Sequence, residues 1–154
     1  AFSGVAEIGR GILVVAWPKG KTLTTPADVA KSDVKRVAMP DPQKAIYGKA
    51  ASEYLEASGL AKAVAGKLLV VGTVPQVTTY LLSGEVDAGF VNRTDVIDLG
   101  PSIGGYLEVD PSLYAPISIV AERLAGAKNA DAAKAFADFV VSDAARAIAA
   151  KHGM

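Results

Sequence analysis

The sequence has no cysteine and a single histidine, and both facts narrow its chemistry. Without cysteine the chain forms neither disulfides nor thiolate metal sites. The one histidine, His152, lies two residues before the end of the sequence, and we interpret it as a frayed terminal residue rather than a catalytic base. The sequence also lacks a nucleophile elbow, a Walker loop and any His/Asp/Glu spacing suited to a metal. We therefore expect no enzyme, no cofactor and no metal site.

The sequence also lacks an excess of charge of either sign and any long apolar run. The 16 basic and 16 acidic residues cancel, and no basic block occurs, which argues against a nucleic-acid partner. No apolar run approaches the ~18 residues of a membrane span. No signal peptide is present, although a mature exported protein would lack one. The 154 residues, 51% of them apolar, are enough for one domain or two small lobes.

The most informative stretch combines a strand, a proline turn and a helix. The apolar run Val37–Met39 is typical of the end of a buried strand, and Pro40 and Pro42 break it. A helix is expected over 45–58, with Gly59 closing it. Its expected apolar face consists of Ile46, Ala50, Ala51, Tyr54 and Leu55. A helix that starts after a tight turn directs free backbone N–H groups and a positive dipole end at an anion.

The same pattern returns one unit later in the chain. The apolar run Leu68–Val71 precedes a turn that contains Pro75, a helix is expected over Gln76–Ser83, and Gly84 follows it. Two such helix starts face one crevice when their strands are neighbours in a parallel sheet. A strand–turn–helix unit alone is a weak signal, and its repetition is what favours a ligand site.

The remaining segments continue the alternation of strands and helices. The other expected strands are Ile12–Ala16, Val86–Val91, Tyr106–Val109 and Pro116–Ala121. A short helix is expected from Pro26 to about Lys31, a turn at Asn92–Asp95, and two helices after Asn129 with a break near Ser142. Ala1–Gly11 has no clear periodicity. We interpret the carboxylates Asp95 and Asp98 as a solvated face. This order predicts an α/β fold with a mostly parallel sheet flanked by helices.

Four segments together resemble the periplasmic molybdate-binding proteins of ABC importers, within the type II periplasmic binding proteins. They are Ala38–Ala51, Thr73–Val77, Ser83–Asn92 and the closing Ala135–Met154. The resemblance extends over nearly the whole chain. Each motif is only moderately specific, and their order and spacing are more so. The resemblance implies the type II periplasmic-binding-protein fold, with two α/β lobes around a cleft that holds an oxyanion.

The resemblance also assigns three ligand-binding positions. Tyr47 matches the residue whose backbone N–H meets the anion at the first helix start, and Val74 matches the backbone donor at the second. Asn92 matches a position at which many members carry a tyrosine whose hydroxyl donates to the anion. A carboxamide NH₂ also donates, but the asparagine side chain is shorter. We expect the Asn92 amide to point into the cleft.

Positive side chains near these turns need a separate interpretation. Lys44, Lys49 and Arg93 lie close to the expected helix starts. We interpret all three as surface cations, with Arg93 the one most worth following because it adjoins Asn92. Neutral donors suit a dianion that must be bound and later released, since several N–H bonds compensate its desolvation without a full ion pair.

Family members begin with a part of lobe one that contains two serine-bearing loops, and this chain starts later. By the resemblance, about 80 residues of lobe one are absent. Residues 1–16 would then be a remnant of lobe one with a hinge strand, residues 17–115 a complete lobe two, and residues 116–154 the return hinge strand and the closing helices. Such a fragment should bind oxyanion weakly. Its exposed apolar face should pack on lobe two or on a second chain: Phe136, Phe139, Val140 and Ile148.

The leading hypothesis is a substrate-binding component of an ABC importer for molybdate or tungstate. Its partners would be the oxyanion and a membrane permease, and it would lie in the periplasm or outside the cell, associated with the membrane through the transporter. Alternatives are a ligand-sensing effector domain of a transcription regulator and a binding protein for another small anion. An enzyme of the porphobilinogen deaminase kind needs a cofactor-bearing cysteine, which this chain lacks.

Overall fold

The computed structural model describes residues 2–154, which form two compact units. Residues 12–115 make the first, here named the sheet unit. The segment that ends at Gly11 makes the second together with Pro116–Met154, and we name it the hairpin unit. The expected division fell after residue 16. Residues 12–16 instead belong to the sheet unit, because their strand is hydrogen-bonded on both sides within its sheet.

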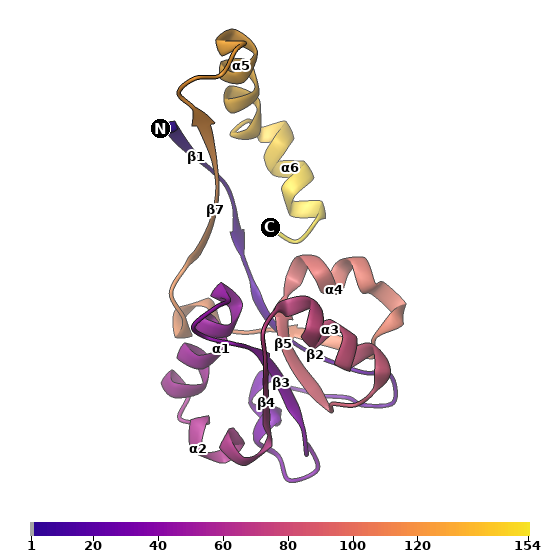
Figure 1. The fold of residues 1–154 in the computed structure, drawn as a ribbon. Coiled ribbons are helices and arrows are strands. Elements are labelled where there is room, and N and C mark those ends of the chain that lie inside the picture. Colours follow the sequence, from indigo (N-terminus) through magenta and orange to yellow (C-terminus); the bar gives the residue numbers. More distant parts are fainter. Residues whose placement is uncertain (1) are drawn as a thin grey trace. The chain divides into compact units, whose positions relative to one another are not determined.

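The sheet unit contains five strands in the order β4-β3-β5-β2-β6 (Figure 1). Their bounds are β2 Leu13–Trp17, β3 Val37–Pro40, β4 Leu68–Val71, β5 Ala88–Asn92 and β6 Gly105–Glu108. β3 pairs in parallel with β4 and β5, whereas β2 pairs antiparallel with β5 and β6. Four strands therefore run in one direction, but two of the four pairings are antiparallel, so the sheet is mixed and not mostly parallel as expected. That β2 runs against its neighbours was not predicted, since an apolar run shows burial and not direction.

Helices connect these strands. The α-helices of the sheet unit are α1 Ile46–Ala57, α2 Ala61–Val64, α3 Val74–Ser83 and α4 Arg93–Leu99. The short 3₁₀ segments are η1 Pro26–Ala30, η2 Ala65–Lys67, η3 Gly100–Ser102 and η4 Pro111–Leu113. α1 and α3 lie where the sequence predicts them. The expected turn at Asn92–Asp95 is instead the start of α4, a helix too short for its apolar period to show in the sequence.

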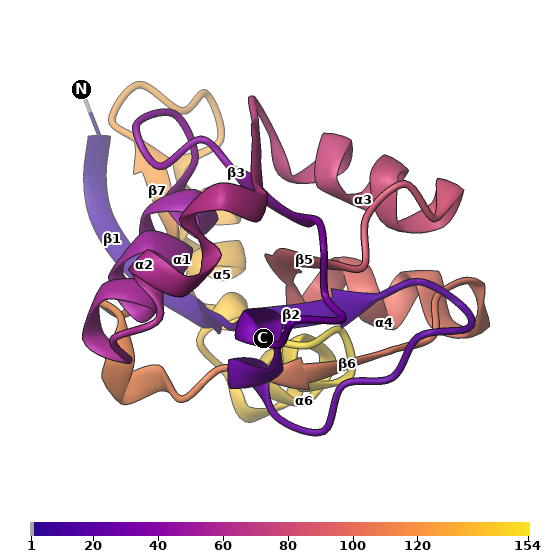
Figure 2. The ribbon, with the colours of Figure 1, turned by 90° about the horizontal axis from the view of Figure 1, so that it is seen from below.

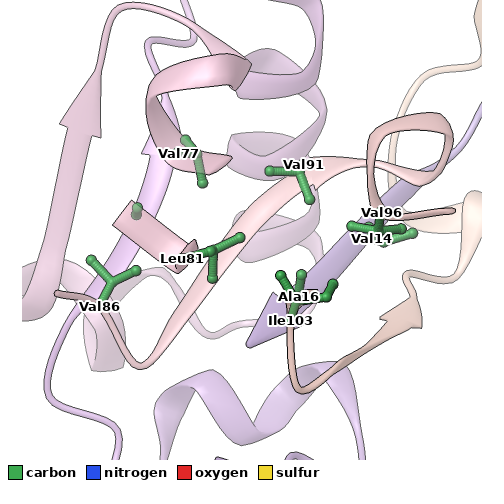
Figure 3. Close-up of a cluster of buried hydrophobic side chains, with 9 residues drawn as sticks. Val14, Ala16, Val77, Leu81, Val86, Val91, Val96 and Ile103 are labelled. Carbon is green, nitrogen blue, oxygen red and sulfur yellow. The ribbon is translucent and has the colours of Figure 1, made fainter. Parts of the chain in front are cut away.

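The sheet is covered on both faces, because successive side chains of a strand point to opposite sides. On one face a cluster of buried side chains joins the strands to α3 and α4 (Figure 3): Val14, Ala16, Ala38, Val77, Leu81, Val86, Val91, Val96 and Ile103. On the other face Phe90 of β5 meets Tyr54 of α1, with ring centroids 6.0 Å apart. Figure 2 shows α1 and α2 on one side of β3 and β5 and α3 on the other. Ile46 departs from the expected apolar face of α1, since it is 55% exposed.

The hairpin unit pairs β1 Phe2–Gly11 antiparallel with β7 Ile117–Leu124. β1 was not predicted. Its pairing with β7 contains register shifts, and these interrupt the alternation that marks a strand in a sequence. The two closing helices are α5 Ala130–Val140 and α6 Asp143–Lys151, and the expected break at Ser142 is confirmed. The Ser142 hydroxyl accepts a hydrogen bond from the Ala145 N–H and caps α6.

Candidate functional site

Three strands of the sheet unit end at the same edge of the sheet, and a helix follows each of them. β4, β3 and β5 run in parallel, so the starts of α3, α1 and α4 gather at their carboxyl ends. The N–H of Asp41, just after β3, donates to the carbonyl oxygen of Val71 at 2.6 Å and ties two of these ends together. This topology brings Tyr47, Val74 and Asn92 to one edge of the sheet, as expected for a crevice of an open α/β fold.

The start of α1 offers backbone N–H groups. Ala45 precedes the helix in extended conformation, and no side chain caps the start. The Ala45 N–H donates to the Asp41 carbonyl, and Lys49 donates to that of Ala45 at 3.0 Å. The N–H groups between them, including that of Tyr47, lie in the first turn, where a helix supplies no acceptor. Gly48 lets this turn lie against the end of β3, since a side-chain carbon there would come 2.7 Å from the Asp41 carbonyl oxygen.

The start of α3 leaves one N–H group open. The Gln76 side-chain oxygen accepts from the N–H groups of Gly72 at 2.7 Å and Thr73 at 3.2 Å, while the Thr73 hydroxyl accepts from the Gln76 N–H. Pro75 has no N–H. Of the amides from 72 to 76, only that of Val74 lacks an acceptor in these bonds. The Thr-x-x-Gln capping box thus satisfies the neighbouring amides and leaves the predicted donor free.

Asn92 is the last residue of β5 and precedes α4. Its side chain is half-buried and does not cap the helix. Instead, Nδ2 donates to Oδ1 of Asp95 at 3.0 Å. Asp95 is half-buried too and is a partner of the predicted site residue, so of the two carboxylates expected on a solvated face only Asp98 is exposed. The Asn-x-x-Asp spacing at a strand end is the signal that could have found this pair.

The three cations near this edge are each paired with a carboxylate. Lys44 Nζ lies 3.4 Å from Asp41 Oδ2, and Lys49 Nζ lies 3.8 Å from Glu53 Oε1. The Arg93 Nε lies 3.2 Å from an oxygen of Glu108, but the two are not aligned for a hydrogen bond. Lys44 and Lys49 are exposed, as expected, whereas Arg93 is half-buried. All three charges are therefore compensated within the protein.

The side chain of Tyr47 adds a second polar group besides the backbone N–H of this residue. Burial raises the pKa of the Tyr47 phenol, and the charges of Asp95 and Tyr114 raise it further. The phenol therefore stays protonated well above neutral pH. Tyr114 is committed elsewhere, since its hydroxyl accepts a hydrogen bond from the Leu13 N–H at 3.1 Å.

Residues 2–154, the described part of the chain, contain neither a metal-binding cluster nor a membrane-spanning helix. No group of three His, Asp or Glu side chains is arranged to hold a metal ion. None of the helices in this part has the length and apolar character needed to cross a membrane.

Comparison with known proteins gives a family and several relatives. Residues 3–154 match the model of a family described as bacterial extracellular solute-binding protein. The molybdate-binding protein ModA of Rhodobacter capsulatus is 36% identical over 126 residues, which are 81% of this chain and 49% of that protein. The protein of the same name from Azotobacter vinelandii is 29% identical over 95% of this chain and 58% of its own length. The chain thus spans about half the length of these relatives.

Solved structures share the fold. The substrate-binding domain of a putative molybdenum ABC transporter from Clostridium difficile superposes with a TM-score of 0.84 at 24% identity, covering 97% of this chain and 65% of that one. The periplasmic molybdate-binding protein of Azotobacter vinelandii gives a TM-score of 0.79 at 23% identity, covering 98% and 67%. These likenesses confirm the periplasmic-binding-protein fold that the sequence resemblance implied.

Proposed function

Because the chain belongs to the bacterial extracellular solute-binding protein family, we propose that it is the substrate-binding part of an ABC importer for molybdate or tungstate. The family is one of solute-binding proteins and not of enzymes. Two relatives named molybdate-binding protein support the choice of ligand. The partner would be a membrane permease, to which the protein delivers its anion from the periplasm or the cell exterior.

The observation that carries the proposal is the gathering of helix starts at one edge of the sheet. The N–H groups of Tyr47 and Val74 lie in the first turns of α1 and α3, where a helix offers them no acceptor. The strands before these helices, β3 and β4, are hydrogen-bonded neighbours. Both helices contribute the positive ends of their dipoles, which favour an anion.

Neutral donors fit the task of an import protein. A tetrahedral dianion has to lose its water on binding and must leave again at the transporter. Hydrogen bonds to a charged group are worth about 1.5–3 kcal/mol each, so a few N–H donors compensate the loss of water. The nearby cations are paired with Asp41, Glu53 and Glu108 and do not add a full counter-charge.

The strongest test removes one donor without disturbing its helix. Val74→Pro eliminates the N–H, and proline is well tolerated at the first position of a helix. Thr73 already has the extended conformation that a following proline requires, with φ −144° and ψ 159°. Val74→Ala keeps the N–H and is the matched control. Titration of ¹⁵N-labelled protein with molybdate, followed by NMR, detects weak binding as well as strong.

We expect molybdate and tungstate to shift the amide signals of Tyr47 and Val74, with sulfate and phosphate much weaker. Val74→Pro should weaken molybdate binding about 10- to 100-fold, while Val74→Ala should stay within about twofold. Tight phosphate binding with no response to molybdate would show that the ligand is phosphate and not a molybdate-type oxyanion. Equal affinities of the two variants would remove Val74 from the site.

We also propose that this chain alone binds weakly and associates with itself. The three assigned donors all lie in the sheet unit, and each further donor contributed by a second lobe is worth about 1 kcal/mol or more. In the hairpin unit, an apolar groove of about 770 Å³ is lined by residues that include Val5, Leu124 and Phe136. An open apolar surface of this kind favours contact with another surface.

Light scattering over a range of concentrations tests self-association. We expect the apparent mass to rise with concentration, and Phe136→Lys to reduce that rise. Calorimetry on the same sample should give millimolar or weaker molybdate affinity. A monomer that binds molybdate at micromolar concentration would contradict both expectations, and the site would then need no second lobe.

A further inference from the structure

The pair formed by Asn92 and Asp95 is the feature of the site that the family resemblance does not explain. The carboxamide nitrogen of Asn92 donates to Asp95 Oδ1 at 3.0 Å, across three residues at the junction of β5 and α4. Both side chains are half-buried. An asparagine in this position commonly caps the following helix, yet the Asn92 side chain makes no capping bond. Its orientation is therefore set by Asp95 and not by the helix start.

This hydrogen bond fixes the orientation of the Asn92 carboxamide, that is, which side its NH₂ group and its oxygen face. A carboxylate only accepts hydrogen bonds, so the NH₂ end and not the oxygen of Asn92 must face Asp95. The NH₂ group has two N–H bonds, and Asp95 Oδ1 accepts one of them. The second N–H remains available to another acceptor. Without the Asp95 carboxylate, a flip of the Asn92 carboxamide would exchange its NH₂ group and its oxygen. The oxygen would then face the anion and repel it.

Among the hydrogen bonds and ion pairs of residues 2–154, no cation binds the Asp95 carboxylate in place of Asn92. Arg93, the adjacent residue, lies against Glu108 with Nε 3.2 Å from the carboxylate oxygen. The Asp95 carboxylate accepts its hydrogen bond from Asn92. The two side chains thus form a local pair at the edge of the sheet where Tyr47 and Val74 present their N–H groups.

We infer that Asp95 is a positioning residue of the anion site: it holds the Asn92 carboxamide so that its second N–H, and not its oxygen, is offered to the bound oxyanion. The inference rests on the proposed function. Asp95 does not itself contact the anion in this arrangement. Through its hydrogen bond, Asp95 orients the Asn92 side chain so that the carboxamide donates one defined hydrogen bond to the anion.

Two variants of Asp95 separate this role from its charge. Asp95→Asn and Asp95→Ala both remove the negative charge beside the site, but only asparagine keeps an oxygen that can accept from Asn92. We expect Asp95→Ala to bind molybdate about two- to tenfold more weakly than Asp95→Asn, the usual effect of one hydrogen bond. Binding is measured by NMR titration with molybdate.

The same pair of variants in the Asn92→Ala background completes a double-mutant cycle. If Asp95 acts through Asn92, the two variants should bind molybdate equally once the carboxamide is gone. A difference of the same size in both backgrounds would overturn the inference, because Asp95 would then act on the fold or on the ligand without Asn92. Equal affinities of Asp95→Ala and Asp95→Asn with Asn92 present would overturn it as well.

A readout without ligand tells the inference apart from the proposed function. The sequence has two asparagines, Asn92 and Asn129, so the side-chain NH₂ signals of Asn92 are readily assigned. Asp95→Ala should move the signal of its bonded proton and leave Asn129 unchanged, since Asn129 caps α5 with its oxygen. If these signals behave as expected but no oxyanion binds, the proposed function fails and the anion role of the pair fails with it. If oxyanion binds and the Asn92 signals ignore Asp95→Ala, only the inference fails.

Discussion

The sheet unit and the hairpin unit share one chain and a similar supply of apolar residues, yet they bury them very differently. Among the residues whose burial the structure describes, twenty-seven apolar side chains are buried, and all but Ile117 belong to residues 12–115. In the hairpin unit Phe136 is 64% exposed and Ile148 52% exposed. In the sheet unit the strands lie between two layers of helices. The hairpin unit consists of a two-stranded ribbon and two helices, which bury few apolar side chains.

The difference shows that apolar content does not make a core without a second surface to pack against. Strands β2, β3 and β5 are buried because helices cover both of their faces. In β7 buried or half-buried residues alternate with exposed ones, the pattern of a ribbon with one free face. The donors proposed for the anion belong to the unit with the firm core, where their positions are well fixed.

The largest expected effect compares two phenylalanines. Phe90 is fully buried in the sheet unit, so Phe90→Ala should lower the free energy of unfolding by about 3–5 kcal/mol. Phe136→Ala makes the same chemical change on the exposed face of α5 and should cost less than about 0.5 kcal/mol. Urea denaturation measures both. Similar losses would mean that the hairpin unit has a core of its own.

The next effect concerns a close contact between backbone segments, the start of α1 and the end of β3. A side-chain carbon at Gly48 would collide with the carbonyl oxygens of Pro40 and Asp41, whereas one at Gly126 of the hairpin unit meets nothing within 4 Å. Gly48→Ala should lower the free energy of unfolding by about 1–3 kcal/mol and shift the NMR signals of the α1 start. Gly126→Ala should leave both nearly unchanged. An unperturbed Gly48→Ala would show that the first turn of α1 has room to move.

A pH-dependent effect comes from Asp28, a buried carboxylate of the sheet unit. The Thr24 N–H and hydroxyl, Lys31 and the Thr25 N–H all favour its ionised form, and they hold the pKa of Asp28 far below its ordinary 3.8. A lowered folded-state pKa contributes stability above the unfolded-state value and loses it as the pH falls through and below that value. Asp28→Asn should therefore flatten the fall in stability below about pH 5. Urea denaturation at several pH values checks this; an unchanged acid limb would contradict it.

The smallest effect is expected for an exposed ion pair of α5. Lys134 Nζ lies 2.7 Å from Asp138 Oδ2, and both side chains are about two-thirds exposed, at 68% and 66%. Such a pair is worth roughly 0.5 kcal/mol at most, and less in salt. Lys134→Ala should therefore change the urea midpoint very little. A loss above about 1 kcal/mol would show that α5 depends on its surface charges in a way that the helices of the sheet unit do not.

The sequence by itself determined the local elements whose causes are local. Proline turns, capping residues and apolar periods were enough to predict α1, α3 and the two closing helices. The repeated strand–turn–helix pattern indicated two helix starts, and the family resemblance then assigned Tyr47 and Val74 to them. Each of these signals lies within about ten residues, the range over which backbone hydrogen bonding and side-chain period act.

Only the tertiary structure decided the features that depend on distant partners. The direction of β2 follows from its pairing with β5 and β6, which lie more than 70 residues later in the chain. β1 exists because β7 supplies its hydrogen bonds. The half-buried pair of Asn92 and Asp95 arises where β5 passes into α4, a short helix that the sequence did not reveal. Pairing and burial are properties of the assembled sheet, and no short stretch of sequence contains them.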